Sequence, residues 1–145
     1  MCCEPIHDGA RIAEDAVAAM RARFCALCVG RPDYVWASLH SAHDDRALGE
    51  AALRAAFEAQ AALVRFRRFR LLDQRAPDAH GIAQVLYSGE LVQPNRARTV
   101  VELATFVQED GAWRYIAGVT RPAEQLAHDP RELSIDHWDC GGHHH

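Results

Sequence analysis

The chain has 145 residues and a net charge of −4, and its composition is 49% hydrophobic and 25% charged. This length and apolar content suit one compact domain with a buried core. The acidic balance argues against a nucleic-acid-binding protein, and no apolar run reaches the roughly 18 residues of a membrane span. The first residues are acidic and cysteine-bearing, unlike a signal peptide, so we expect a cytoplasmic protein.

The first half of the chain is predicted to be helical. Apolar residues recur at helical spacing over residues 13–29, and Gly30 followed by Pro32 ends that pattern. Residues 33–39 predict a second, short helix, and residues 48–63, rich in alanine, leucine and glutamate, predict a third.

The second half of the chain predicts four strands, over residues 64–72, 82–92, 98–108 and 113–119, separated by turn-forming residues. Helices followed by a run of antiparallel strands predict an α+β fold, with the helices packed on one face of a curved sheet. We assign this single domain to residues 13–122.

The third predicted strand has two largely apolar faces. Val100, Glu102 and Phe106 lie on one face, and Val101 and Leu103 lie on the other. A sheet with helices on one side only should have a wetter outer face, so we expect a partner subunit or the C-terminal segment to cover the second face. Of these two, we favour a homodimer.

Short motifs follow one another along the chain with a characteristic order and spacing: Cys2-Cys3, His7-x-Gly9, Met20-Arg21-x-Arg23-Phe24, Gly30, Asp33-Tyr34 and Asp110-Gly111-x-Trp113-x-Tyr115. This order resembles the YchJ family of SEC-C-motif proteins. The resemblance implies a cone-shaped, nuclear transport factor two-like (NTF2-like) or cystatin-like fold. It does not imply a reaction.

The same resemblance leads us to interpret the two ends of the chain. The family carries a C-P-C-G-S-G segment that completes a zinc site with the cysteine pair, and that half of the SEC-C motif is missing here. We therefore interpret residues 1–12 as a remnant of the motif. Residues 123–145 are expected to form a tail, partly disordered or derived from a tag.

A carboxylate is predicted inside the cone. Glu102 shares the interior face of its strand, where a charge needs a cation or several hydrogen-bond donors. We expect an ion pair with Arg21, or failing that with Arg23, and favour a structural role over a catalytic one. Tyr87 and Trp113 are assigned to the same interior set.

His40 is the second candidate for chemistry. It stands where the family carries a histidine and lies near His43, Asp44 and Asp45, so it could act as a general base. A helix-end cap or a solvated loop explains the same residues.

Zinc is the one cofactor that the sequence suggests. Cys2, Cys3, Cys140 and His143 could form a tetrahedral set if the two termini meet, and an odd count of five cysteines does not suggest a disulfide framework. A tag remnant explains the terminal histidines equally well. In the separate Cys25-x-x-Cys28 motif, we expect Cys28 to face the core as a small buried hydrophobe.

The densest charge cluster runs from Arg65 to Arg70 and contains Phe66 and Phe69. A basic strand with interleaved aromatics can hold single-stranded nucleic acid. We favour the alternative, an edge strand whose arginines face water while both phenylalanines pack inward.

Together these features predict a small ligand-binding or partner-binding module without enzymatic activity. The first alternative is a cofactor-independent isomerase or dehydratase that uses His40 and Glu102. The second is a zinc-dependent protein-interaction module. An open polar pocket with an unpaired Glu102 would favour the enzyme, whereas a filled cone with Glu102 locked to an arginine would favour a structural module.

Overall fold

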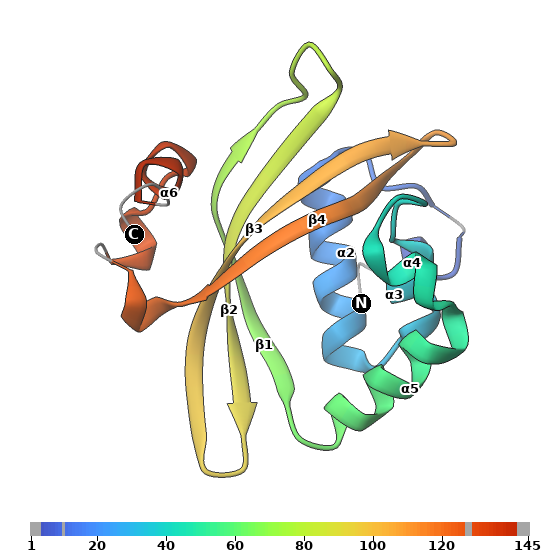
Figure 1. The fold of residues 1–145 in the computed structure, drawn as a ribbon, viewed down its shortest axis with the longest axis horizontal. Coiled ribbons are helices and arrows are strands. Elements are labelled where there is room, and N and C mark those ends of the chain that lie inside the picture. The colour runs from blue at the N-terminus through green and yellow to red at the C-terminus, as the bar shows by residue number, and fades with distance from the viewer. Residues whose placement is uncertain (1–3, 10, 127–128, 142–145) are drawn as a thin grey trace.

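A computed structural model describes residues 4–9, 11–126 and 129–141, shown in Figure 1. The helices of the first half are α1 (Glu4–His7), α2 (Ala16–Val29), α3 (Pro32–Ala37), α4 (Asp44–Leu48) and α5 (Glu50–Ala61). The strands are β1 (Arg65–Arg75), β2 (Ile82–Gln93), β3 (Arg96–Glu109) and β4 (Ala112–Pro122). Two 3₁₀ turns, Ala123–Gln125 and Pro130–Glu132, and helix α6 (Ile135–Gly141) follow.

Local sequence signals set the ends of the helices. Asp15 caps α2 by accepting a hydrogen bond from the amide of Ala18 at 2.8 Å, and Gly30 ends the helix in the left-handed conformation with φ of 79°. The third predicted helix is interrupted. Gly49, with φ of 93°, separates α4 from α5, because this backbone conformation does not continue a helix.

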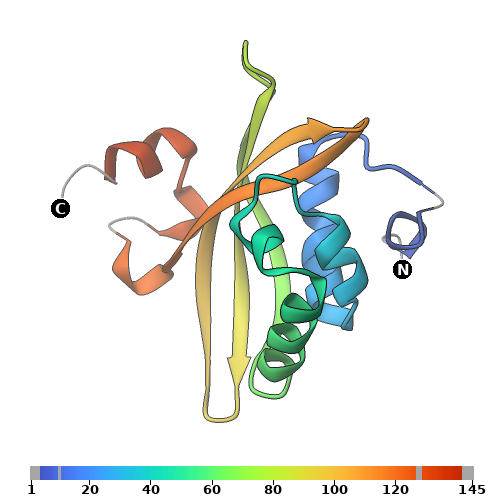
Figure 2. The same ribbon diagram turned by 45° about the vertical axis from the view of Figure 1, so that its right-hand side comes forward.

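The four strands form one antiparallel sheet in the order β1-β2-β3-β4. Helices α2 to α5 lie on one side of this curved sheet, and the C-terminal segment lies on the other, as Figures 1 and 2 show. The predicted α+β fold, with helices on an antiparallel sheet, is confirmed. None of the helices in the described ranges is long and apolar enough to cross a membrane.

Two of the three irregularities in strand pairing decide which aromatic side chains face the helices. The pairing of β1 with β2 shifts between Arg67 and Arg70, where Arg68 adopts a φ of 62°. Residues three apart normally lie on opposite faces of a strand, but this bulge lets Phe66 and Phe69 both pack against the helix-side core. Both phenylalanines therefore pack inward, as the sequence predicted.

The second irregularity lies between β3 and β4. Thr105 pairs with Ala117 and Phe106 pairs with Tyr115, so one extra residue, Ile116, is accommodated in β4. The extra residue puts Tyr115 on the same face as Gly118, and Tyr115 is buried in the core beside α2.

The sheet separates two hydrophobic cores. The larger one lies between α2 and the sheet and includes Met20 and Phe106. The smaller one lies on the opposite face, where Leu86, Val101 and Leu103 pack against the C-terminal residues Leu133, Ile135 and Trp138. The sequence predicted that either a partner subunit or the C-terminal segment covers this face, and the C-terminal segment packs on it.

The C-terminal segment is also fixed by polar contacts. The amide of Ile135 donates to Asp73 at 2.8 Å, Arg75 pairs with Asp136, and the Arg121 guanidinium lies 4.7 Å from the centre of the Trp138 ring. In its described part, this segment is therefore an integral cover of the sheet and not the loose tail that the sequence predicted.

Replacing Ile135 with alanine tests this cover. Ile135 is fully buried, so Ile135→Ala should lower the free energy of unfolding by about 2–5 kcal/mol, because it removes buried methyl groups and leaves a cavity. Urea denaturation measures the loss, and Leu48→Ala, at a side chain that is 71% exposed, is the control. An unchanged unfolding free energy in Ile135→Ala would show that the segment is not part of the cooperative fold.

Candidate functional site

A half-buried carboxylate linked to two phenols lies on the helix side of the sheet, beside the larger core. The two carboxylate oxygens of Glu102 each accept one hydrogen bond, from the hydroxyl of Tyr87 and from the hydroxyl of Tyr115. Glu102 and Tyr87 are cross-strand partners on β3 and β2, and Tyr115 comes from β4. The cluster therefore ties three neighbouring strands together.

The phenol of Tyr115 reaches Glu102 through a gap in β4. Gly118 is the strand partner of Ala104, and a Cβ atom placed on Gly118 would overlap both the Tyr115 hydroxyl and the Glu102 carboxylate. The missing side chain gives these two groups room to meet. An isolated glycine inside a strand pattern often marks such a close approach.

Arg23 supplies a positive charge next to the cluster. Its Nη1 donates to the hydroxyl of Ser38 at 2.7 Å and to the carbonyl of Val35 at 3.2 Å, and its guanidinium lies 4.2 Å from the centre of the Tyr115 ring. The guanidinium thus joins α2 to the end of α3 and stacks on a tyrosine that holds Glu102.

The partner of Glu102 differs from the sequence-based expectation. Two neutral phenols satisfy the carboxylate, in place of the ion pair predicted with Arg21 or Arg23. Arg21 is exposed and lies 4.9 Å from the centre of the Phe69 ring. Phenol donors are an effective substitute, because hydrogen bonds to an ionised acceptor are stronger than those between neutral groups.

The pKa values of three side chains at the cluster are shifted from their ordinary values. Burial, followed by the negative charge of Glu102, raises the pKa of Tyr87 and of Tyr115, so both phenols stay protonated at neutral pH. The ring of His43 lies 5.3 Å from that of Tyr115, and burial lowers the pKa of this histidine. His43 is therefore neutral at neutral pH.

His40 lies away from Glu102. Its Nε2 is 3.8 Å from a carboxylate oxygen of Glu109, and its Nδ1 accepts a hydrogen bond from the amide of Ala42 at 3.0 Å. Glu109 is in turn bound by Ser41, which holds the pKa of that carboxyl below its usual range. The structure thus brings His43, and not His40, next to the tyrosine–carboxylate cluster.

A pocket of about 320 Å³ opens over the cluster, between α2, α5 and the sheet. Apolar side chains make up much of its wall, and polar groups are few. The lining residues are Arg23, Phe24, Leu27, Gln60, Phe66, Tyr87, Gly89, Leu91, Val100, Glu102, Tyr115 and Thr120. An apolar wall with a few convergent polar groups is typical of a small-molecule site.

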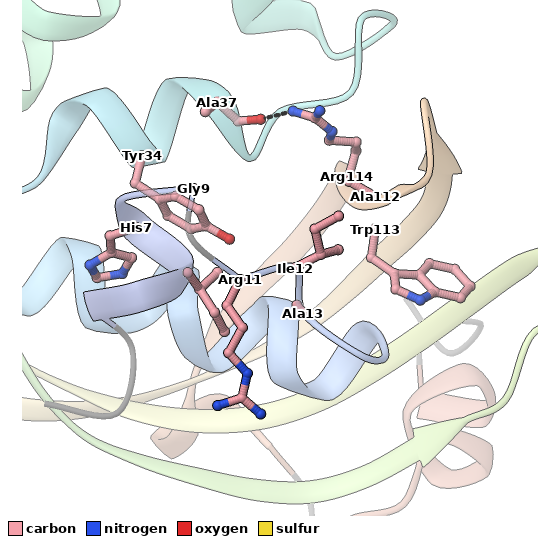
Figure 3. A pocket seen from close by; sticks show the side chains of 11 residues that line it. His7, Gly9, Arg11, Ile12, Ala13, Tyr34, Ala37, Ala112, Trp113 and Arg114 are labelled. Atoms are coloured by element: carbon pink, nitrogen blue, oxygen red, sulfur yellow. Dashed lines mark hydrogen bonds between the residues drawn. The ribbon is translucent and has the colours of Figure 1, made fainter.

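Trp113, assigned from sequence to the interior set, lines a different hollow of about 210 Å³ (Figure 3). The N-terminal segment, α3 and the β3–β4 hairpin form this hollow, and Arg114 closes one side by donating to the carbonyl of Ala37. The described residues that line it include no carboxylate. Trp113 thus packs against the helix-side core that contains Tyr87, but it does not line the pocket at Glu102.

The predicted zinc ligands belong to the two ends of the chain. Cys2, Cys3 and His143 lie outside the described residues, as does the side chain of Cys140. Within the described ranges, no group of three or more metal-ligating side chains is gathered at one point. The prediction that Cys28 faces the core is wrong, because this residue is exposed near the end of α2.

Sequence reasoning missed three members of the cluster, Tyr115, Gly118 and Ser38. Tyr115 closes the Asp110-to-Tyr115 motif, but its orientation depends on the bulge at Ile116. Gly118 carried a usable signal, since a single glycine within a predicted strand points to close packing. Ser38 had no distinguishing signal in the sequence.

The helices packed on a curved antiparallel sheet, with a pocket at their junction, define the class of NTF2-like domains. A family model described as "YchJ, middle NTF2-like domain" matches residues 15–118. The chain therefore belongs to the YchJ family. It is also 30% identical over 122 residues to the UPF0225 protein YchJ of Shigella dysenteriae serotype 1, covering 84% of this chain and 76% of that relative.

Two solved structures share the fold. A SEC-C motif containing protein from Rhodopseudomonas palustris matches with a TM-score of 0.66 at 22% identity, covering 81% of this chain and 88% of that one. A second such protein, from Psychrobacter arcticus, matches with a TM-score of 0.65 at 22% identity, covering 79% and 68%. At this identity the two structures support the fold alone.

The gap at Gly118 can be tested by filling it. Gly118→Ala should destabilise the fold by about 1–3 kcal/mol, because the new methyl group overlaps the Tyr115 hydroxyl and the Glu102 carboxylate. In a Glu102→Ala/Tyr115→Phe background the same change should cost much less, and a double-mutant cycle by urea denaturation measures the difference. An equal cost in both backgrounds would contradict the overlap.

The raised tyrosine pKa values predict loss of stability in alkali. Both phenols ionise more readily in the unfolded chain, where the pKa is about 10. Their contribution to the free energy of unfolding is therefore complete below that pH and is lost as pH rises through the pKa values of the folded state. Tyrosinate absorbance should show that two of the three tyrosines titrate late. Glu102→Gln should bring both titrations to lower pH, whereas three coincident titrations near pH ~10 would contradict the prediction.

Proposed function

We propose that this protein binds a small molecule in the pocket over Glu102. The observation that carries the proposal is a carboxylate held by two phenols at the bottom of a pocket of about 320 Å³ with a largely apolar wall. A carboxylate has about four acceptor positions, and the tyrosines use two of them. The remaining positions are available to donors on a ligand.

The wall of the pocket indicates the kind of ligand. Phe24, Phe66 and Leu27 offer apolar contact, and Glu102 offers an anionic acceptor. A compact molecule with an apolar ring or chain and one N–H or ammonium donor matches both features. Arg23 lies at the pocket with its Nη1 already bonded to Ser38 and Val35, so it orients Tyr115 and is not proposed as the main ligand contact.

The geometry supports binding better than catalysis. The enzyme alternative rested on His40 acting together with Glu102, but His40 faces Glu109 and is not among the pocket residues. Tyr87 and Tyr115 have raised pKa values, so neither is a base at neutral pH. Glu102 is neither unpaired, as the enzyme would need, nor locked to an arginine, as a purely structural module would have it.

Other parts of the functional hypothesis stay predictions. The second alternative, a zinc-dependent interaction module, stays a prediction because its proposed ligands fall outside the described residues. A homodimer also stays a prediction, although residues 133–138 cover the apolar face that suggested it. A cytoplasmic location is proposed from the sequence alone.

Binding of a ring-bearing amine tests the proposal. Benzylamine should shift the amide resonances of α2 and β3 around the pocket in a two-dimensional NMR titration, and toluene, which lacks the ammonium group, should bind more weakly. Glu102→Gln should weaken benzylamine binding about tenfold, because it removes a charged acceptor worth roughly 1.4 kcal/mol or more.

The matched control is Glu109→Gln, which removes a carboxylate of the same charge outside the pocket. This variant should bind benzylamine as the wild type does. Equal weakening in both variants, or resonance shifts confined to other surfaces, would contradict the proposed site.

A further inference from the structure

The opposite face of the sheet carries a second, larger hollow. The turns after β4 lie over the outer surface of β1 and β2, on the side away from α2 (Figures 1 and 2), and enclose a groove of about 720 Å³. Three arginines lie along a wall that also has apolar surface. Its lining residues are Arg68, Phe69, Arg70, Ser88, Gly89, Glu90, Thr99, Ala123, Asp129, Pro130 and Arg131.

Two donors on neighbouring strands face this groove. Arg70 on β1 and Ser88 on β2 are cross-strand partners, so their side chains lie on the same face of the sheet. Ser88 is 7% exposed, and its hydroxyl is not one of the buried atoms left without a partner in the described residues. Arg70 is exposed, and its positive charge acts on Asp129 at the same groove. A guanidinium and a hydroxyl on one face of a groove are donors that a ligand can use.

The other charges around the groove are largely compensated. Arg67 donates to Glu90, and Arg131 pairs with Asp129 at 3.0 Å. Arg68 and Arg70 are left in excess, because Arg68 reaches Glu90 only at 3.9 Å and its side chain is 74% exposed. The groove therefore has a local positive charge within a chain whose net charge is −4.

The backbone at Arg68 supports a role for this side chain. A φ of 62° is uncommon for a residue with a side chain as long as arginine, and glycine or asparagine fits that conformation at lower cost. The bulge itself explains the inward turn of Phe66 and Phe69, but it does not explain why an arginine occupies the strained position. Such positions cluster at ligand sites.

We propose that this groove binds a small phosphate-bearing anion. The guanidinium groups of Arg68 and Arg70 and the hydroxyl of Ser88 are donors of the kind that phosphate oxygens accept. The site lies on the opposite face of the sheet from Glu102, and Gly89 is the one described residue that lines both hollows, so the proposal does not rest on the amine pocket. Glu90 and Asp129 at its edges disfavour a long polyanion such as a nucleic acid, which would pass close to both carboxylates.

Isothermal titration of the full chain with pyrophosphate and with adenosine monophosphate tests the proposal, with adenosine as the uncharged comparison. Saturable binding of at least one phosphate compound and none of adenosine is expected. Arg70→Gln should weaken that binding about tenfold and Ser88→Ala about threefold, in line with the loss of one charged and one neutral hydrogen bond.

Arg65→Gln is the matched control, because Arg65 is exposed on the same strand but does not line the groove. It should bind as the wild type does. Three results would overturn the proposal: no saturable binding of either phosphate compound, an equal loss in Arg65→Gln and Arg70→Gln, or binding of a single-stranded oligonucleotide alone. Arg70 is exposed, and Asp129, on which its charge acts, keeps its pair with Arg131, so misfolding of Arg70→Gln is not expected to obscure the result.

Discussion

A half-buried carboxylate on the inner face of the sheet is the constraint on which most of this structure depends. Leaving Glu102 unsatisfied would cost several kcal/mol, so its two oxygens must find donors within the fold. The phenols of Tyr87 and Tyr115 are those donors. They reach the carboxylate from the strands on either side of β3, so satisfying one charge fixes the relation of three strands.

The same requirement extends outward to the backbone and to the helices. Tyr115 faces inward because β4 accommodates an extra residue at Ile116, and its hydroxyl fits beside Glu102 because position 118 has no side chain. Arg23 then covers the Tyr115 ring and bonds the end of α3. The half-buried carboxylate of Glu102 thus links the bulge in β4, the glycine at position 118 and the position of α3.

Much of the fold was predictable because it depends on local patterns. The helix of residues 13–29 and the two faces of β3 follow from periodicity, and the turn at Asp110-Gly111 follows from turn chemistry. The bulges were not predictable, since an extra residue in a strand leaves the apolar alternation only slightly disturbed. The partner of Glu102 depends on one of those bulges, which explains why an arginine was expected where Tyr115 is found.

The C-terminal segment shows a different limit. Leu133, Ile135 and Trp138 do not form a long periodic pattern, so their sequence resembles a tail with one aromatic anchor. Their packing is evident only against Leu86, Val101 and Leu103, which are distant in the chain. The apolar second face of β3 did indicate that a cover was needed, but it could not distinguish this segment from a second subunit.

The pKa shifts around Glu102 support the proposed binding of a ligand over the enzyme alternative. Catalysis by proton transfer needs a group whose pKa is near the working pH. At the Glu102 cluster, burial moves the tyrosine pKa values upward and that of His43 downward, away from neutrality in both cases. Each group therefore keeps one protonation state at neutral pH, as donor or as acceptor, and fixed donors and acceptors favour recognition of one hydrogen-bonding pattern.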